Sequence, residues 1–242
     1  MRFDRFLAPA DARRASQVIE KLVLLGLRDF ALTGGLAIEA HLAGHSTMVR
    51  SLNDVDIVVE SFAAIPPALA DGFLFRHIHP HAPRGRTLVQ LVDPSEAVRI
   101  DIFGACGATL ARSAPVNFPC APIAVVALED LAAREASLLM DLAHGSPVPL
   151  KHARDFQRLA GAVATADSRR MAQAWGDHRK SRDPETFDEA AARIAELAQS
   201  RRDLLTVPDY SRDADAVCSK CRETGTFRLA PAGTILSILG YC

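Results

Sequence analysis

The segment Asp54-Val-Asp-Ile-Val-Val-Glu60 constrains the fold more than any other stretch of this chain. It alternates carboxylates with apolar residues at first and then becomes continuously apolar. This pattern is typical of a strand whose beginning faces a cleft and whose end is buried in a sheet. Because residues two apart on a strand point the same way, the carboxylates of Asp54 and Asp56 are expected to face one cleft.

A second strand that carries a carboxylate is expected at Val98-Arg-Ile-Asp-Ile-Phe103. Asp101 lies there between two isoleucines, and burying an unpaired carboxylate is costly. If this strand lies beside the first one, Asp101 joins Asp54 and Asp56. Two other interpretations stay open: an edge strand with Asp101 in solvent, or an ion pair with Arg99, which shares its face.

A third feature is the pair Gly34-Gly35, which is expected to follow a strand over residues 29–33 and to precede a helix over 36–42. Glycines at such a turn let backbone N–H groups approach a phosphate beside the positive end of a helix. Taken alone, the pair more often marks a turn that binds nothing, and Asp-x-Asp alone more often marks a solvated strand end.

Together the glycine turn and the three carboxylates predict a phosphoryl-transfer site with divalent metal. Neighbouring carboxylates repel one another unless a cation lies between them, and Mg²⁺ (or Mn²⁺) prefers such oxygen ligands. One metal would hold a triphosphate and the other would activate an attacking hydroxyl. Asp101 would bridge to that second metal or act as the base.

The remaining pattern predicts an α/β (α+β) protein: a mixed sheet flanked by helices, followed by a helical C-terminal half. A helix is expected over residues 11–27, and Pro66-Pro67 is expected to open a short helix. Residues 104–122 are rich in Gly, Ala and Pro, which predicts mostly loop. The other expected strands cover 73–78, 87–92 and 123–126, and the other expected helices cover 128–142 and, with breaks near 164–168 and 176–184, residues 151–205.

The 242 residues are enough for two small domains with buried cores. We expect a core over residues 1–127, a helical domain over 128–207 and a cysteine-containing appendage over 208–242. Glu129 and Asp130 lie near the start of the second part, where acids favour the dipole of the expected helix.

The composition fits an ordinary soluble globular protein, with 49% hydrophobic and 24% charged residues. The formal net charge of −1 excludes a global basic field for nucleic acid. The apolar stretches are too short for a membrane span, and no signal peptide is expected. The five cysteines, an odd number, fit a reducing compartment, so a cytoplasmic location is expected.

The motifs resemble the DNA polymerase beta-like nucleotidyltransferase superfamily and, more narrowly, the AbiEii-type toxin nucleotidyltransferases. The resemblance covers roughly residues 15–165. The superfamily often has Gly-Ser at the turn, whereas this chain has Gly35 there and Thr33 before the pair. The matching segments are Thr33-Gly-Gly-Leu-Ala, Arg50-Ser-Leu-Asn-Asp-Val-Asp-Ile-Val-Val, Val98-Arg-Ile-Asp-Ile-Phe, Leu128-Glu-Asp-Leu-Ala-Ala-Arg-Glu and Lys151-His-Ala-Arg-Asp-Phe.

This resemblance implies an enzyme that moves a nucleoside monophosphate from an NTP to a hydroxyl acceptor. Asp54, Asp56 and Asp101 would be its catalytic metal ligands. The acceptor would be the 3′ end of a tRNA, and the protein a toxin controlled by an antitoxin. A small-molecule or protein acceptor and a catalytically silent nucleotide-binding module are the alternatives. The implied nucleotide-binding residues are Thr33, Gly34, Gly35, Arg50, Lys151 and Asp155.

For several further side chains, the sequence leaves two possible roles open. Lys151 and Asp155 are four apart on an expected helix, which also fits a surface ion pair. Arg84 and Arg86, with Arg50, could form a basic lip for phosphate, although loop arginines are usually just solvated. The alternating histidines could bind metal but more often form an exposed strand face. They are His77, His79 and His81.

The cysteine tail contains half of a zinc site. Cys218 and Cys221 have the Cys-x-x-Cys spacing, and Cys242 is a possible third ligand for structural Zn²⁺. Reduced thiols without a metal are the competing interpretation. The fourth ligand is open between His178, Cys106, Cys120 and a partner chain.

Overall fold

The computed structural model describes residues 2–43, 50–78, 87–119, 122–164 and 166–207. They fall into two compact units. The first contains residues up to 106 together with 110–126, and the second contains 107–109 and the described residues from 127 onward.

The first unit is built on a seven-stranded mixed sheet with the strand order β3-β4-β5-β2-β1-β7-β6. β2 pairs parallel with β5, and β1 pairs parallel with β7, whereas the other neighbours are antiparallel. The predicted mixed sheet is thus confirmed. Its strands are β1 (Phe30–Thr33), β2 (Asp54–Val59), β3 (Leu74–Ile78), β4 (Thr87–Asp93), β5 (Val98–Gly104), β6 (Ala114–Asn117) and β7 (Pro122–Val125).

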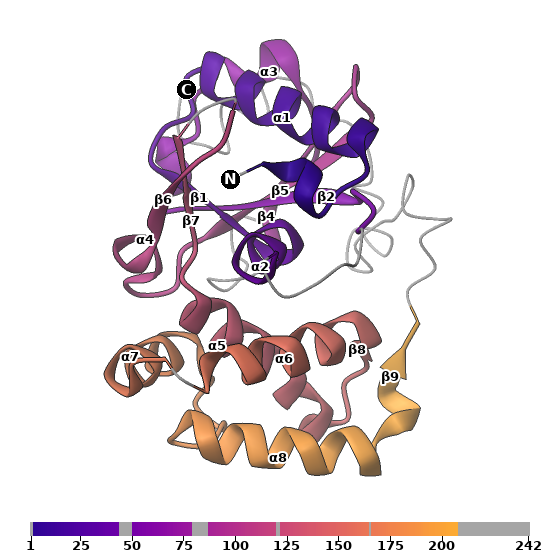
Figure 1. The fold of residues 1–242 in the computed structure, drawn as a ribbon, viewed down its shortest axis with the longest axis vertical. Helices are drawn as coiled ribbons and strands as arrows, with labels where there is room; N and C mark the ends of the chain where they lie inside the picture. Colours follow the sequence, from indigo (N-terminus) through magenta and orange to yellow (C-terminus); the bar gives the residue numbers. More distant parts are fainter. Residues whose placement is uncertain (1, 44–49, 79–86, 120–121, 165, 208–242) are drawn as a thin grey trace. The chain divides into compact units, whose positions relative to one another are not determined.

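The apolar residues of the central strands form the core of this unit. Val55, Ile57 and Ile100 have no exposed surface, as expected for strands covered on both faces. In Figure 1, α1 and α3 lie on one side of the sheet and α2 on the other. The helices are α1 (Pro9–Leu24), α2 (Gly34–Leu42), α3 (Leu69–Gly72) and α4 (Thr109–Arg112), with short 3-10 turns η1 (Phe3–Arg5) and η2 (Phe62–Ala64).

The segment 104–122 departs from the expected loop, because it contains α4 and the edge strand β6. β6 has the sequence Ala-Pro-Val-Asn and no fully buried side chain, so it gives no hydrophobic alternation that a sequence pattern could detect. It exists because it pairs antiparallel with β7. Its edge position also tolerates Pro115, which lacks a backbone donor.

The second unit is helical, as predicted for the C-terminal half. The helix expected over 128–142 ends at Leu139 and continues as a 3-10 turn, and Thr186 with Glu189 forms a capping box at the start of α8. The elements are α5 (Leu128–Leu139), η3 (Met140–His144), β8 (Val148–Pro149), α6 (Leu150–Val163), α7 (Ser168–His178), α8 (Phe187–Ser200), η4 (Arg202–Leu204) and β9 (Leu205–Thr206).

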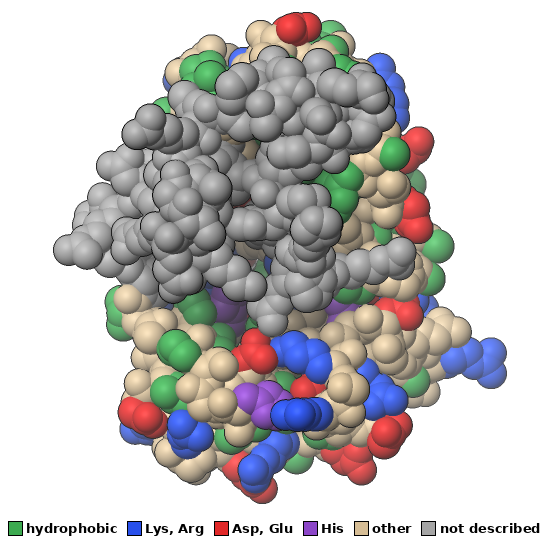
Figure 2. All heavy atoms as spheres, turned by 180° about the vertical axis from the view of Figure 1, so that it is seen from behind, with side chains coloured by type: hydrophobic (Ala, Val, Ile, Leu, Met, Phe, Trp, Pro, Cys, Tyr) green, Lys and Arg blue, Asp and Glu red, His purple; other side chains and the backbone are tan. Residues whose placement is uncertain are grey.

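The described surface carries charge of both signs. On the face shown in Figure 2, basic and acidic side chains are interspersed over the described residues, in keeping with the net charge of −1. None of the described helices combines the length and the apolar character that a membrane crossing requires.

Candidate active site

The register of four neighbouring strands gathers polar side chains into one row. Asp56 of β2 lies opposite Thr33 of β1 on one side and Asp101 of β5 on the other, and Asp101 lies opposite Gln90 of β4. The next row on the same face pairs Asp54 with Arg99. The site is therefore a consequence of register: a shift of one residue would move these side chains to the opposite face.

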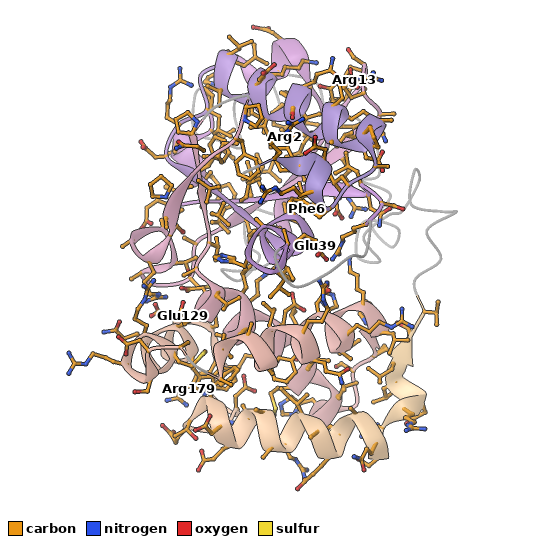
Figure 3. All side chains as sticks on the ribbon, in the orientation of Figure 1. Arg2, Phe6, Arg13, Glu39, Glu129 and Arg179 are labelled. Carbon is orange, nitrogen blue, oxygen red and sulfur yellow. The ribbon has the colours of Figure 1, made fainter. Side chains whose placement is uncertain are left out.

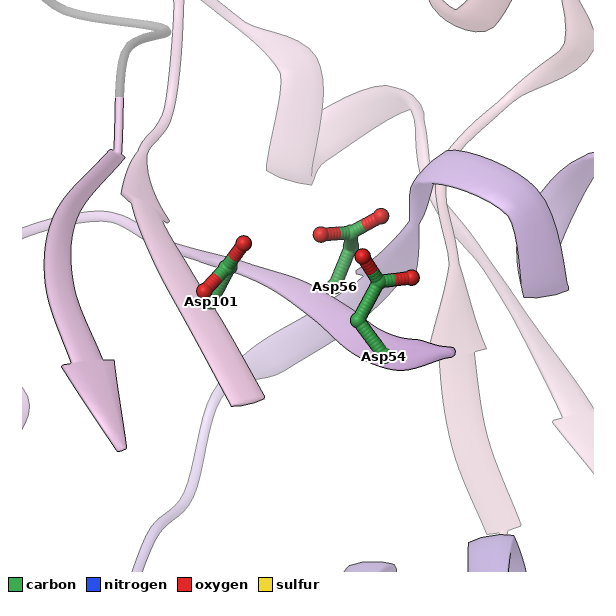
Figure 4. Close-up of side chains that lie close together, drawn as sticks. All are labelled: Asp54, Asp56 and Asp101. Atoms are coloured by element: carbon green, nitrogen blue, oxygen red, sulfur yellow. The ribbon is translucent and has the colours of Figure 1, made fainter. Parts of the chain in front are cut away.

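The three carboxylates lie close enough to share a cation (Figure 4). One ligand oxygen from each of Asp54, Asp56 and Asp101 lies within 4.8 Å of the other two. Asp101 is buried, and the other two are half-buried. Because β5 lies between β4 and β2, the alternative of an edge strand with Asp101 in solvent is wrong.

Two neighbouring side chains, Gln90 and Arg99, hold the carboxylates of Asp54 and Asp101 in place. The Gln90 amide Nε2 donates a hydrogen bond of 2.8 Å to Oδ1 of Asp101. Arg99 donates to Oδ2 of Asp54 through Nη2, and its Nε lies 3.4 Å from Oδ2 of Asp101. The Arg99–Asp101 ion pair considered from the sequence is therefore present together with the carboxylate cluster.

The glycine pair has a role that the sequence did not indicate. Gly34 has φ of 59°, and a Cβ built on it would lie 1.9 Å from Oδ2 of Asp56. A Cβ on Gly35 would lie 2.5 Å from Nη2 of Arg50. Gly34 is needed because the Asp56 side chain packs directly on a backbone with positive φ, whereas Gly35 is approached by the end of the flexible Arg50 side chain.

Contacts of both its backbone and its guanidinium group hold Arg50 beside this turn. Its backbone N–H donates to the carbonyl of Phe6 at 2.8 Å. Its guanidinium Nη1 lies 3.5 Å from Oε1 of Glu39, a buried residue of α2 that is labelled in Figure 3. Arg50 thus places a positive charge at the N-terminal turn of α2, next to Gly35.

Gly34→Ala should disrupt both the turn and the site. The new Cβ meets the Asp56 carboxylate, and residue 34 must keep a positive φ that alanine disfavours. We therefore expect a loss of about 1–3 kcal/mol in the free energy of unfolding. Urea denaturation measures this loss, and Mn²⁺ titration tests the displacement of Asp56. Gly161→Ala is the control, because its Cβ would have no neighbour within 4 Å in α6. If the Gly34→Ala protein were as stable as the wild type, the predicted strain at residue 34 would be absent.

The predicted nucleotide residues Lys151 and Asp155 both belong to α6 of the second unit. Asp155 is buried and lies 3.7 Å from the guanidinium of Arg158. Lys151 lies near Glu135 of α5 and contributes positive charge to its surroundings. Their part in nucleotide binding stays a prediction.

Glu135 is a buried carboxylate that stays ionised. Its Oε2 lies 2.7 Å from Nδ1 of His152. Burial by itself raises the pKa of Glu135. The hydrogen bond and charge of His152, with the charges of Arg134 and Lys151, outweigh burial and hold this pKa below its ordinary value of 4.5.

This lowered pKa gives the second unit an acid-sensitive stability. The unfolded chain binds the proton more readily than the folded one, so the contribution of Glu135 is complete above pH 4.5 and is lost as the pH falls through the folded pKa. Glu135→Gln should lower the free energy of unfolding by about 1–3 kcal/mol at neutral pH. On acidification, the variant protein should lose less of this free energy than the wild type. Urea unfolding at several pH values measures this, with the exposed Glu196→Gln as control. Parallel acid curves for wild type and Glu135→Gln would refute it.

Several predicted ligands lie outside the described residues. They are His79, His81, Arg84, Arg86, Cys120, Cys218, Cys221 and Cys242. His77 lies on β3 opposite Gln90 of β4. The zinc site, the basic lip and the histidine face therefore stay predictions.

Gln90 is a site residue that sequence reasoning missed. It stands in the strand Thr-Leu-Val-Gln-Leu-Val-Asp and is 7% exposed. The signal is the same as for Asp101: one polar residue between apolar neighbours in a buried strand. A buried amide needs a hydrogen-bond partner, and a carboxylate on the adjacent strand supplies one.

Comparison with known proteins gives structural neighbours but no sequence family. No protein-family model and no curated protein matches the chain. Several solved structures resemble it, of which three follow. The antibiotic-resistance factor ANT(2'')-Ia has TM-score 0.44 and 13% identity, over 80% of this chain and 99% of its own. An antigenic nucleotidyltransferase-like protein from Paracoccidioides brasiliensis has TM-score 0.35 and 15% identity, over 72% and 96%. JHP933 from Helicobacter pylori has TM-score 0.32 and 12% identity, over 82% and 94%.

Proposed function

We propose that this chain is a nucleotidyltransferase that moves a nucleoside monophosphate from an NTP to a hydroxyl acceptor. The acceptor oxygen bonds to the α-phosphorus, the bond to the β-phosphate breaks, and pyrophosphate leaves. The observation that carries the proposal is the carboxylate cluster of Asp54, Asp56 and Asp101 on adjacent parallel strands, with ligand oxygens within 4.8 Å. The glycine turn and Arg50 beside it add the means to hold phosphate.

The donor set of the cluster fits a divalent metal. Three carboxylates supply hard oxygen ligands, which Mg²⁺ and Mn²⁺ prefer over nitrogen or sulfur. When bound there, such an ion supplies charge neutralisation for the phosphates and activation of the attacking hydroxyl. Without a cation the three negative charges oppose one another.

Each residue of the site has a separate role in the proposed reaction. Asp54 and Asp56 would hold a divalent metal beside the triphosphate. Asp101, oriented by the hydrogen bond from Gln90, completes the cluster and receives the proton of the acceptor hydroxyl. Arg50 and the N-terminal turn of α2 attract the negative phosphates.

The acceptor we propose is the 3′ hydroxyl of a tRNA, with the protein acting as the toxin of a toxin–antitoxin pair. The support is the sequence resemblance over roughly residues 15–165. A small molecule or a protein side chain is the alternative acceptor. Lys151 and Asp155 are proposed to help position the nucleotide on the same ground.

Transfer from each of the four labelled NTPs, with Mg²⁺, to total RNA and to total protein of a bacterial lysate tests the proposal. The Asp54→Asn/Asp56→Asn double variant runs in parallel. Label in RNA that the variant does not produce supports a tRNA acceptor, and label in protein moves the acceptor to a side chain.

Failure to label either fraction leads to a second measurement, Mg²⁺-dependent NTP binding. Binding that the double variant loses would keep the site and point to a small-molecule acceptor or a silent nucleotide-binding module. Absence of binding in the wild type would exclude the enzyme.

A further inference from the structure

Arg99 contacts two of the three carboxylates in the candidate site. It stands on β5 two residues before Asp101, so its side chain lies on the same face of the sheet, and the register places it opposite Asp54. Its guanidinium donates to Oδ2 of Asp54 and lies 3.4 Å from Oδ2 of Asp101. The Arg99 side chain is 20% exposed, so its charge is only partly screened by water.

The position of Arg99 matters because the cluster carries three negative charges. Like charges at these separations repel strongly when solvent is partly excluded. A guanidinium between Asp54 and Asp101 offsets part of this repulsion and holds both carboxylates on one side of the site. The backbone of β5 fixes where the guanidinium can reach, so the arrangement belongs to the fold.

A cation at the cluster would draw on the same carboxylates that Arg99 contacts. Asp54 and Asp101 each direct Oδ2 toward Arg99, and a divalent ion that takes these oxygens as ligands competes with the guanidinium. An added positive charge at the cluster also repels Arg99 directly. Metal binding and the Arg99–Asp54 contact therefore oppose each other.

We infer that Arg99 is an internal counter-ion of the metal site: it holds the carboxylates together in the metal-free protein and gives up Asp54 when a divalent cation binds. It is a positioning residue that sets the metal affinity. The inference rests on the proposed metal site and goes beyond it, because it assigns a site-specific role to a residue that is not a ligand.

Mn²⁺ binding tests this role without requiring catalysis. Arg99→Gln should bind Mn²⁺ at least about tenfold more tightly than the wild type, because the competing charge is removed. Its metal-free unfolding midpoint should fall, and Mg²⁺ should raise that midpoint more than in the wild type. Arg99→Lys, which keeps the charge, should restore most of the wild-type affinity.

The matched control is Arg14→Gln, which removes the same charge from the same unit. Arg14 pairs with Asp11 at 3.0 Å and donates to the backbone carbonyls of Glu96 and Ala97, and it contacts none of the three carboxylates. Its Mn²⁺ affinity should equal that of the wild type. Equal or weaker Mn²⁺ binding by Arg99→Gln would overturn the counter-ion role while leaving the metal site intact. Absence of Mn²⁺ binding in the wild type would overturn both the role and the proposed function.

A measurement on the wild-type protein covers the case in which Arg99→Gln does not fold. The Nε–H resonance of Arg99, assigned by comparison with Arg99→Lys, should shift during a Mg²⁺ titration with the same midpoint as metal binding. The resonance of Arg14 should not shift. A stationary Arg99 resonance at saturating Mg²⁺ would show that the guanidinium keeps its contacts and would overturn the inference.

Discussion

Asp101→Asn should reduce nucleotidyl transfer by about a thousandfold while leaving the protein folded. The metal that we propose Asp101 helps to hold would supply several kcal/mol of charge stabilisation to the transition state, and about 1.4 kcal/mol corresponds to a factor of ten in rate. Asn has nearly the same shape, and its carbonyl oxygen can still accept the 2.8 Å hydrogen bond from Gln90. The loss should therefore fall on the rate and on Mn²⁺ affinity.

Stability separates this interpretation from simple damage to the core. Removing one of three neighbouring negative charges should leave the metal-free protein at least as stable as the wild type. The control is Asp71→Asn, an exposed acid of α3, which should keep full activity. An Asp101→Asn protein with wild-type transfer would remove Asp101 from the catalytic site, and one that unfolds would assign it a structural role.

The shared face of Asp54 and Asp56 and the burial of Asp101 could be predicted from the sequence, because both depend only on residues close by in the chain. The period of two along Asp54–Glu60 places Asp54 and Asp56 on one face, and the apolar neighbours of Asp101 mark it as a buried polar residue. Strand order is not local. That β5 lies between β4 and β2, so that Asp101 meets Asp56, depends on pairing between segments more than forty residues apart.

The contacts of the two glycines and the burial of Asp130 could be recognised only from the three-dimensional packing. Gly34 and Gly35 fit a phosphate turn from sequence, but the atoms that approach them in the structure belong to Asp56 and Arg50. From the sequence, Asp130 was expected to favour the helix dipole near the start of α5, and the structure adds that it has no exposed surface. A burial pattern of this kind depends on what packs over the helix, and the sequence of the helix does not encode its neighbours.

Asp130→Ala should destabilise the second unit by about 3 kcal/mol or more. Asp130 accepts a hydrogen bond of 3.0 Å from the Thr109 hydroxyl, and Nε2 of His178 lies 3.1 Å from the same oxygen. The His178 side chain is 7% exposed. Removing the acid leaves two buried polar groups without this acceptor, and each unsatisfied buried polar group costs about 1–3 kcal/mol.

Trp175 offers a direct readout of this loss. It is the single tryptophan of the chain, is 1% exposed, and lies in α7 three residues before His178. Its fluorescence therefore reports unfolding of the second unit. The urea midpoint of Asp130→Ala should fall by about 1–3 M, since the unfolding free energy of small domains changes by about 1–3 kcal/mol per molar urea.

Two further variants decide how the Asp130 effect arises. Asp130→Asn keeps an acceptor for Thr109 but removes the charge, so its loss should lie between those of the wild type and Asp130→Ala. Asp203→Ala breaks an exposed pair with Arg201, at 3.8 Å, and should change stability by less than about 1 kcal/mol. If Asp130→Ala behaved like Asp203→Ala, the buried contacts of Asp130 with Thr109 and His178 would contribute little to the stability of the second unit.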